Sequence, residues 1–191
     1  MLRDDDAETL DLFEDALSWR RLSVDASEKD VVDRSKRFFA HCVDETLRTI
    51  VRDRLEIRTC IAALRRRHRG EGAPSSEITW GFGRWTGRIA ANWNEAAFGL
   101  DHVFPWLPEA GRLMREPDTL ALERLILEKS YQRLQRVSIG HEFDFNAVVI
   151  YVLKWSIVDR WGRYNGEAAK RRFADLTEAG LGPYQQLEFE G

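Results

Sequence analysis

Apolar residues recur every three or four positions along most of this 191-residue chain, which is the spacing of one face of an α-helix. The longest such run, residues 28–69, contains neither proline nor glycine. A helix of that length would span roughly 63 Å at about 1.5 Å per residue. The pattern therefore predicts an all-α fold, a multi-helix assembly packed around one long helical spine over residues 28–69.

Shorter helices are predicted before and after this spine. A first helix carries Leu10, Phe13 and Leu17 on one face, and a later one ends near Gly140. Asp144 suits the N-cap of the next helix, because its carboxylate can accept a hydrogen bond from a first-turn amide. The apolar positions of this helix form a broad stripe made of Val148, Tyr151, Val152, Trp155, Val158 and Trp161.

Two expectations attach to this stripe. If the Trp155 ring is fully buried, Trp155→Ala should cost about 3–5 kcal/mol of stability, whereas an unchanged thermal midpoint would indicate an exposed partner surface. Gly162 or Gly166 is expected to end the helix, because glycine is a poor helix former. A separate amphipathic helix is then predicted over residues 167–179.

The spine ends in a basic cluster, Arg65 to Arg69, followed by Gly70. Positive charge is favourable at a helix C-terminus and glycine suits the position after it, so the cluster has a purely structural interpretation. The functional alternative is an electrostatic contact with an acidic partner or with phosphate, and the candidate partner-binding residues are Arg65, Arg66 and Arg69. Changing all three to glutamate is then expected to weaken assembly by like-charge repulsion.

A loop over residues 71–76 follows and supplies the best internal boundary. Residues 1–70 are predicted to hold the first helix and the spine, and residues 71–191 an aromatic-rich helical region that shares one continuous fold with it. The aromatic residues after the loop are expected to form a buried layer rather than a base-stacking platform, because only Arg84 and Arg88 lie among them. They are Trp80, Phe82, Trp85, Trp93, Phe98, Phe104 and Trp106.

Composition narrows the class of protein. The chain is 43% hydrophobic and has no apolar run of the roughly 18–20 residues that cross a bilayer, and its N-terminus does not resemble a secretory signal. These features predict a cytoplasmic protein that meets membranes only through partners. The net charge of −3 argues against nucleic-acid binding. Cys42 and Cys60 are expected to be reduced, buried core residues.

Candidate catalytic chemistry is sparse. His41 and Glu45 would lie one turn apart on the spine and could share a metal, which leaves a metal-dependent helical-bundle enzyme as an alternative. The other histidines, His68, His102 and His141, are scattered along the sequence. Phosphate-binding, dinucleotide-binding and nucleophile-elbow motifs are missing from the sequence, so we predict a protein that is not an enzyme and needs no cofactor.

Two segments carry a resemblance to a known family. The first is Glu56-Ile57-Arg58-Thr59, which continues to Ala63-Leu64-Arg65, and the second is Phe143-x-Phe145-x-x-Val148-x-x-Tyr151-x-x-Lys154. Together they resemble the C/d family of V/A-type ATPase subunits, and look closest to the small bacterial variant encoded beside V-type ATPases. Thr59 stands where that family usually has asparagine.

The resemblance implies an all-helical, non-catalytic coupling protein of the rotary ATPase. Its partners would be the central shaft or the membrane rotor ring, between which such proteins act as a socket. A free-standing regulatory protein-binding module is a further alternative, because amphipathic helices serve both roles.

Overall fold

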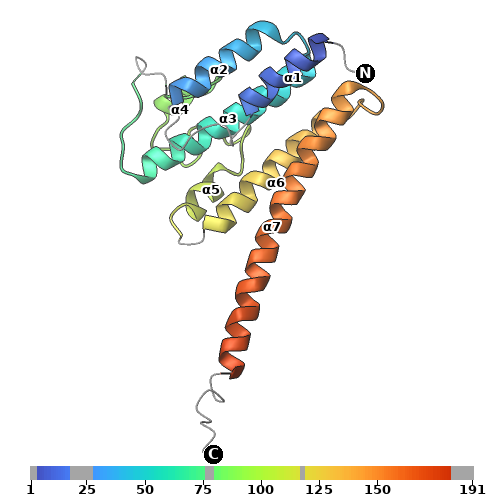
Figure 1. Ribbon diagram of the computed structural model, residues 1–191. Coiled ribbons are helices and arrows are strands. Elements are labelled where there is room, and N and C mark those ends of the chain that lie inside the picture. The colour runs from blue at the N-terminus through green and yellow to red at the C-terminus, as the bar shows by residue number, and fades with distance from the viewer. Residues whose placement is uncertain (1–3, 18–27, 76–79, 117–118, 182–191) are drawn as a thin grey trace, which may run out of the picture.

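The computed structural model describes residues 4–17, 28–75, 80–116 and 119–181, and those residues form seven helices without a strand. The predicted all-α fold is confirmed (Figure 1). The helices are α1 (Asp4–Leu17), α2 (Glu28–His41), α3 (Glu45–His68), α4 (Thr86–Ala91), α5 (Leu107–Leu113), α6 (Thr119–Val137) and α7 (Phe145–Leu181).

The spine predicted over residues 28–69 is wrong as a single helix, because the chain breaks between α2 and α3 and reverses direction there (Figure 1). Asp44 causes the break: its backbone is extended and its Oδ1 accepts a hydrogen bond from the Leu47 amide at 2.9 Å. Arg48 caps the C-terminal end of α2, because its guanidinium donates hydrogen bonds to the carbonyls of Phe39 and Cys42. An aspartate N-cap therefore divides a run that has no proline or glycine.

Helix α3 is nevertheless the helix around which the others pack. Its first half, including Leu47 and Val51, shares a hydrophobic cluster with α1, α2, α6 and α7. Its second half, including Cys60 and Leu64, belongs to a second cluster with residues 80–110. Cys42 and Cys60 are both free and buried, as predicted, and burial raises the pKa of the Cys60 thiol to about 12. The proposed division of the chain at residue 70 stays a prediction.

The aromatic-rich segment is buried as the sequence indicated. The second cluster contains Trp80, Trp93, Phe98 and Phe104, with Trp85 and Trp106 packed against it. Two polar side chains on the buried face of α3 fix the chain that enters this layer. Thr59 Oγ1 accepts from the Phe82 amide at 2.9 Å and donates to the Phe82 carbonyl at 3.0 Å. Glu56 accepts a hydrogen bond from the Trp85 indole at 3.0 Å and pairs with Arg84.

The turn from α6 into α7 is joined to the start of α3 by polar contacts. Asp144 caps α7 as predicted, since its Oδ1 accepts from the Ala147 amide at 2.7 Å and its Oδ2 contacts His141. The other ring nitrogen of His141 lies 3.1 Å from Thr46 Oγ1. Asn146 donates to Asp44 Oδ2 at 3.0 Å. The carboxylate that begins α3 therefore also positions the start of α7.

Helix α7 contains 37 residues and is not interrupted at Gly162 or Gly166, so the prediction of two helices here is wrong. Each glycine destabilises a helix by about 1 kcal/mol relative to alanine, and the neighbouring residues with high helix propensity offset this loss. At about 1.5 Å per residue, α7 is roughly 55 Å long. Its second half, residues 163–181, extends beyond the other helices, and we call it the arm (Figure 1).

Candidate docking surfaces

Helix α7 is apolar on two opposite faces. One face packs on the helical body through Val149, Ile150 and Ile157, all buried. The other face is solvent-exposed and carries large apolar side chains whose exposed fractions run from 49% to 68%. These side chains are Val148, Tyr151, Val152, Trp155 and Val158, and we call this set the α7 stripe.

The stripe arises from the spacing of its members. Positions 148, 151, 152, 155 and 158 follow the three-and-four spacing of one helix face, while 146, 149, 150, 153 and 157 follow it on the other. Sequence periodicity finds both faces but does not say which one meets the body. The Trp155 ring is 58% exposed, so the condition for a 3–5 kcal/mol loss on its removal is not met. Trp161 is partly buried and stacks on Tyr131, with 6.2 Å between the ring centroids.

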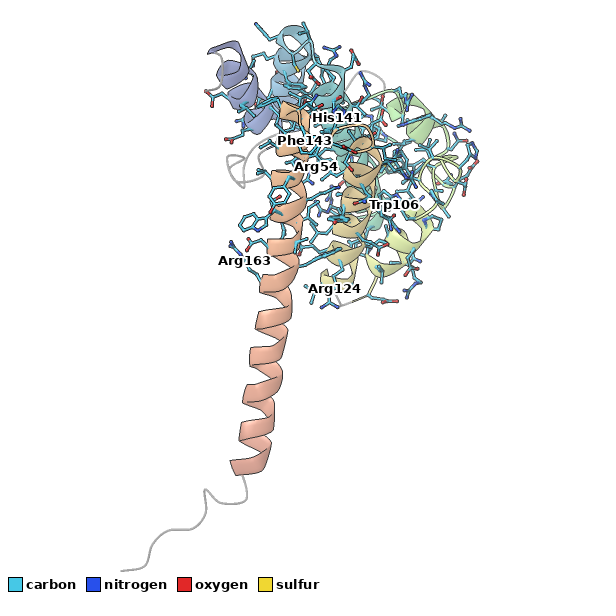
Figure 2. The ribbon with its side chains drawn as sticks, turned by 90° about the vertical axis from the view of Figure 1, so that its right-hand side faces the viewer. Arg54, Trp106, Arg124, His141, Phe143 and Arg163 are labelled. Carbon is cyan, nitrogen blue, oxygen red and sulfur yellow. The ribbon has the colours of Figure 1, made fainter. Side chains whose placement is uncertain are left out.

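The α7 stripe forms a contiguous apolar patch on the surface of the helix. With aromatic side chains contributing about 150–250 Å² each when fully exposed, the five partly exposed residues present on the order of 500 Å². The largest apolar patch on a typical monomer is about 300–600 Å² and is often functional, so the size of the stripe is compatible with a docking surface. The neighbouring Phe143, which precedes α7, is fully exposed as well (Figure 2).

Charged side chains near the stripe have partners within the chain. Lys154 donates to Ser138 Oγ at 3.1 Å, and Arg163 pairs with Asp159 at 2.7 Å. Arg160 pairs with Glu123 of α6. The stripe is therefore an apolar surface bordered by internally paired charges.

The predicted partner-binding arginines lie together at the C-terminal end of α3. Arg66 Nε lies 2.8 Å from one Glu71 oxygen, and Arg69 lies 2.6 Å from the other. The hydrogen bond from Arg69 is the main cause that lowers the pKa of Glu71. Arg65 is exposed on the same turn. The structure thus gives Arg66 and Arg69 a local role in closing the helix end, which the sequence spacing does not reveal.

Arg67, which the sequence does not single out, binds the aromatic layer. Its guanidinium donates to the carbonyls of Trp93, Glu95 and Ala96 and lies over the Phe98 ring, 4.2 Å from the ring centroid. These carbonyls belong to a turn-rich segment. No sequence spacing links residue 67 to residues 93–98, so only the fold identifies this contact.

The candidate metal pair is separated by the helix break. His41 ends α2 and contacts the Arg37 carbonyl, whereas Glu45 begins α3 and pairs with Arg48. Among the residues that the structure describes, no group of three or more histidine, cysteine, aspartate or glutamate side chains is placed to hold a metal ion.

A cavity of about 800 Å³ lies between α1, α3, α6 and α7. Its walls combine apolar residues, among them Phe13, Ile50 and Leu134, with charged residues, among them Asp53 and Arg54 of α3. Burial, with a smaller effect of the nearby Arg160, lowers the pKa of Arg54 to about 10. No sequence signal marks this cavity, because its lining comes from four separate helices.

Within the described ranges, no helix has the length and apolar character needed to cross a membrane. Comparisons of the chain with protein-family models, with curated proteins and with solved structures found no match. The function is therefore inferred from geometry and chemistry.

Proposed function

We propose that this protein is a non-catalytic helical adaptor that docks onto a partner protein, and that its partner is a V/A-type rotary ATPase. The observation that carries the adaptor role is the α7 stripe, a contiguous apolar surface on a helix that also extends past the body. The rotary ATPase is suggested by the resemblance of residues 56–65 and 143–154 to the C/d family of its subunits.

The form of α7 supports a docking role. One face anchors the helix through Val149, Ile150 and Ile157, so the opposite face is presented in a fixed orientation. A rigid apolar face binds with a small loss of conformational freedom, and its two aromatic residues are of the type enriched among energetically dominant interface residues. In this proposal the protein is cytoplasmic and meets the membrane only through the ATPase.

The basic end of α3 is a second contact candidate in this proposal. Arg66 and Arg69 are engaged with Glu71, so the exposed Arg65 is the residue best placed to meet an acidic partner without disturbing the helix end. A contact of this kind would affect the rate of association and its salt dependence more than the final affinity.

Capture from native membranes tests the proposal. Tagged wild-type protein should retain shaft or rotor-ring components of a rotary ATPase, identified by mass spectrometry. Trp155→Ser should reduce that retention, whereas Ile139→Ser should not, because Ile139 is also highly exposed but lies in the turn before α7. If wild-type protein retains no rotary-ATPase component, the assignment of the partner is wrong.

A further inference from the structure

The spacing of the α7 stripe continues in the sequence along the arm. After Val158 the same three-and-four spacing passes through Gly162 and Gly166, and then through Ala169, Phe173 and Leu176. The spacing that would continue the body-facing row passes instead through Tyr164, Ala168, Arg171, Asp175 and Glu178. Apolar residue types thus continue at the spacing of the stripe in the sequence beyond the part of α7 that packs on the body.

We propose that the α7 stripe is covered by the α7 helix of a second copy of this chain, paired antiparallel with a two-fold axis near Gly162. This inference rests on the proposed function in treating the stripe as a docking face, and it names the occupant of that face. In this arrangement the second copy occupies the stripe in the free protein and the ATPase displaces it on assembly, so the two occupants of the stripe exclude each other.

The antiparallel direction follows from the distribution of large and small residues. The half of α7 on the body carries Tyr151 and Trp155, whereas the next two turns carry Gly162 and Gly166. In a parallel pair, Trp155 would face Trp155 and glycine would face glycine, which leaves crowding in one layer and a gap in another. Antiparallel pairing about residue 162 sets Trp155 opposite residue 169, an alanine, and Val148 opposite residue 176, a leucine.

Glycine at the axis permits close approach of the two helices. Gly162 and Gly166 are exposed, and a Cβ added at either position meets nothing within 4 Å, so their role is not to fit against their own chain. Small residues at the crossing point of two helices let the backbones approach, as in helix pairs built on glycine spaced four residues apart. The midpoint of α7, which spans Phe145–Leu181, also lies next to residue 162.

The stripes of two copies supply close to the smallest area that a specific pair requires. The α7 stripe presents on the order of 500 Å² per chain, so two stripes approach the roughly 1,000 Å² of total buried surface expected of a specific interface. The arm, which covers the partner's stripe in this arrangement, adds its own share. Two α7 helices in contact along their whole length would associate as a coiled coil does.

Cysteine cross-linking of the full-length protein tests both the pairing and its direction. Under mild oxidation Gly162→Cys should form a covalent dimer, because the two copies of residue 162 meet at the axis. Val148→Cys alone should form no covalent dimer, but a mixture of Val148→Cys and Leu176→Cys should form a covalent heterodimer. The native Cys42 and Cys60 are buried and give little background.

Sedimentation of the purified wild-type protein supplies the second readout. A dimer at micromolar concentration that Trp155→Ser shifts at least tenfold towards monomer, and Ile139→Ser does not, supports the proposal. Circular dichroism confirms that each variant is folded. Covalent dimers of Val148→Cys alone would overturn the antiparallel direction, and a wild-type monomer at all concentrations would overturn self-pairing. Neither result depends on the ATPase, whose retention in the capture experiment decides the proposed function separately.

Discussion

Ile157 and Trp155 lie two residues apart on α7 and both border the cavity between α1, α3, α6 and α7, but Ile157 is buried and Trp155 is largely exposed. Ile157 is 4% exposed and belongs to the hydrophobic cluster that the first half of α3 shares with α1, α2 and α6. Ile157→Ala removes most of a buried side chain and leaves a cavity between helices that cannot fully collapse. We expect a loss of about 2–5 kcal/mol in the free energy of unfolding. For a chain of this size, that corresponds to a fall in Tm of roughly 4–20 °C.

The matched variant is Trp155→Ala on the other face of the same turn. The Trp155 ring is mostly in solvent, so its removal should change the stability of the dilute monomer by less than about 1.5 kcal/mol, although a larger side chain is lost. Urea denaturation at low protein concentration, followed by far-ultraviolet circular dichroism, measures both variants. Low concentration matters because any self-association adds a concentration-dependent contribution to stability.

The order of the two losses is the decisive result. If Trp155→Ala costs as much as Ile157→Ala, or more, at low concentration, then the Trp155 face packs against the body. The description of α7 as a helix with one anchored and one exposed face would then be refuted.

Three further predictions concern the body and its basic end. Glu56→Ala should cost about 1–3 kcal/mol because the partly buried Trp85 indole loses its acceptor. Burial is the main cause that raises the pKa of Glu56, so the contribution of this side chain to stability is greatest at low pH and is lost as pH rises through its folded-state pKa. Urea denaturation measured at several pH values should therefore show the free energy of unfolding of Glu56→Gln rising relative to that of wild type as pH increases. A difference that does not change with pH would contradict this. Asp44→Ala should cost about 0.5–2 kcal/mol by removing the α3 N-cap, and Asp44→Asn should cost less; equal losses for the two in thermal melts would count against the capping role. Arg65→Glu should lower capture of ATPase components at low salt with an unchanged Tm, and equal capture would exclude the basic end of α3 as a contact.

Periodicity predicts the class of fold because nearly every helix buries one apolar face, and the aromatic residues of the 80–106 segment have the density of a core layer. Periodicity does not predict the break before α3, because the break is made by an aspartate cap in a segment without proline or glycine. The continuity of α7 escapes it for the converse reason, since Gly162 and Gly166 suggest an end that the structure does not have.

The sequence predicts which residues form the candidate site but not how they are exposed or paired. Periodicity identifies the residues of the α7 stripe, but their exposure depends on which of two apolar faces meets α6 and α3, and that choice is made by tertiary packing. The contacts of Arg67 and the cavity beside Arg54 join residues from separate segments, so no local pattern could indicate them. The basic cluster is visible in the sequence, whereas its pairing with Glu71 requires the fold of residues 69–71.

The proposals for α7 agree on one property, that the stripe is an exposed face which a partner covers. The most direct measurement is the rate of maleimide labelling of Tyr151→Cys, since Tyr151 is 68% exposed and the native cysteines are buried. The predicted result is rapid labelling of the dilute protein, with strong protection when the protein is concentrated or bound to native membranes. Slow labelling of the dilute protein would show that the stripe is buried by its own chain. Equally rapid labelling under all three conditions would show that nothing covers it, and either result would contradict a docking role for α7.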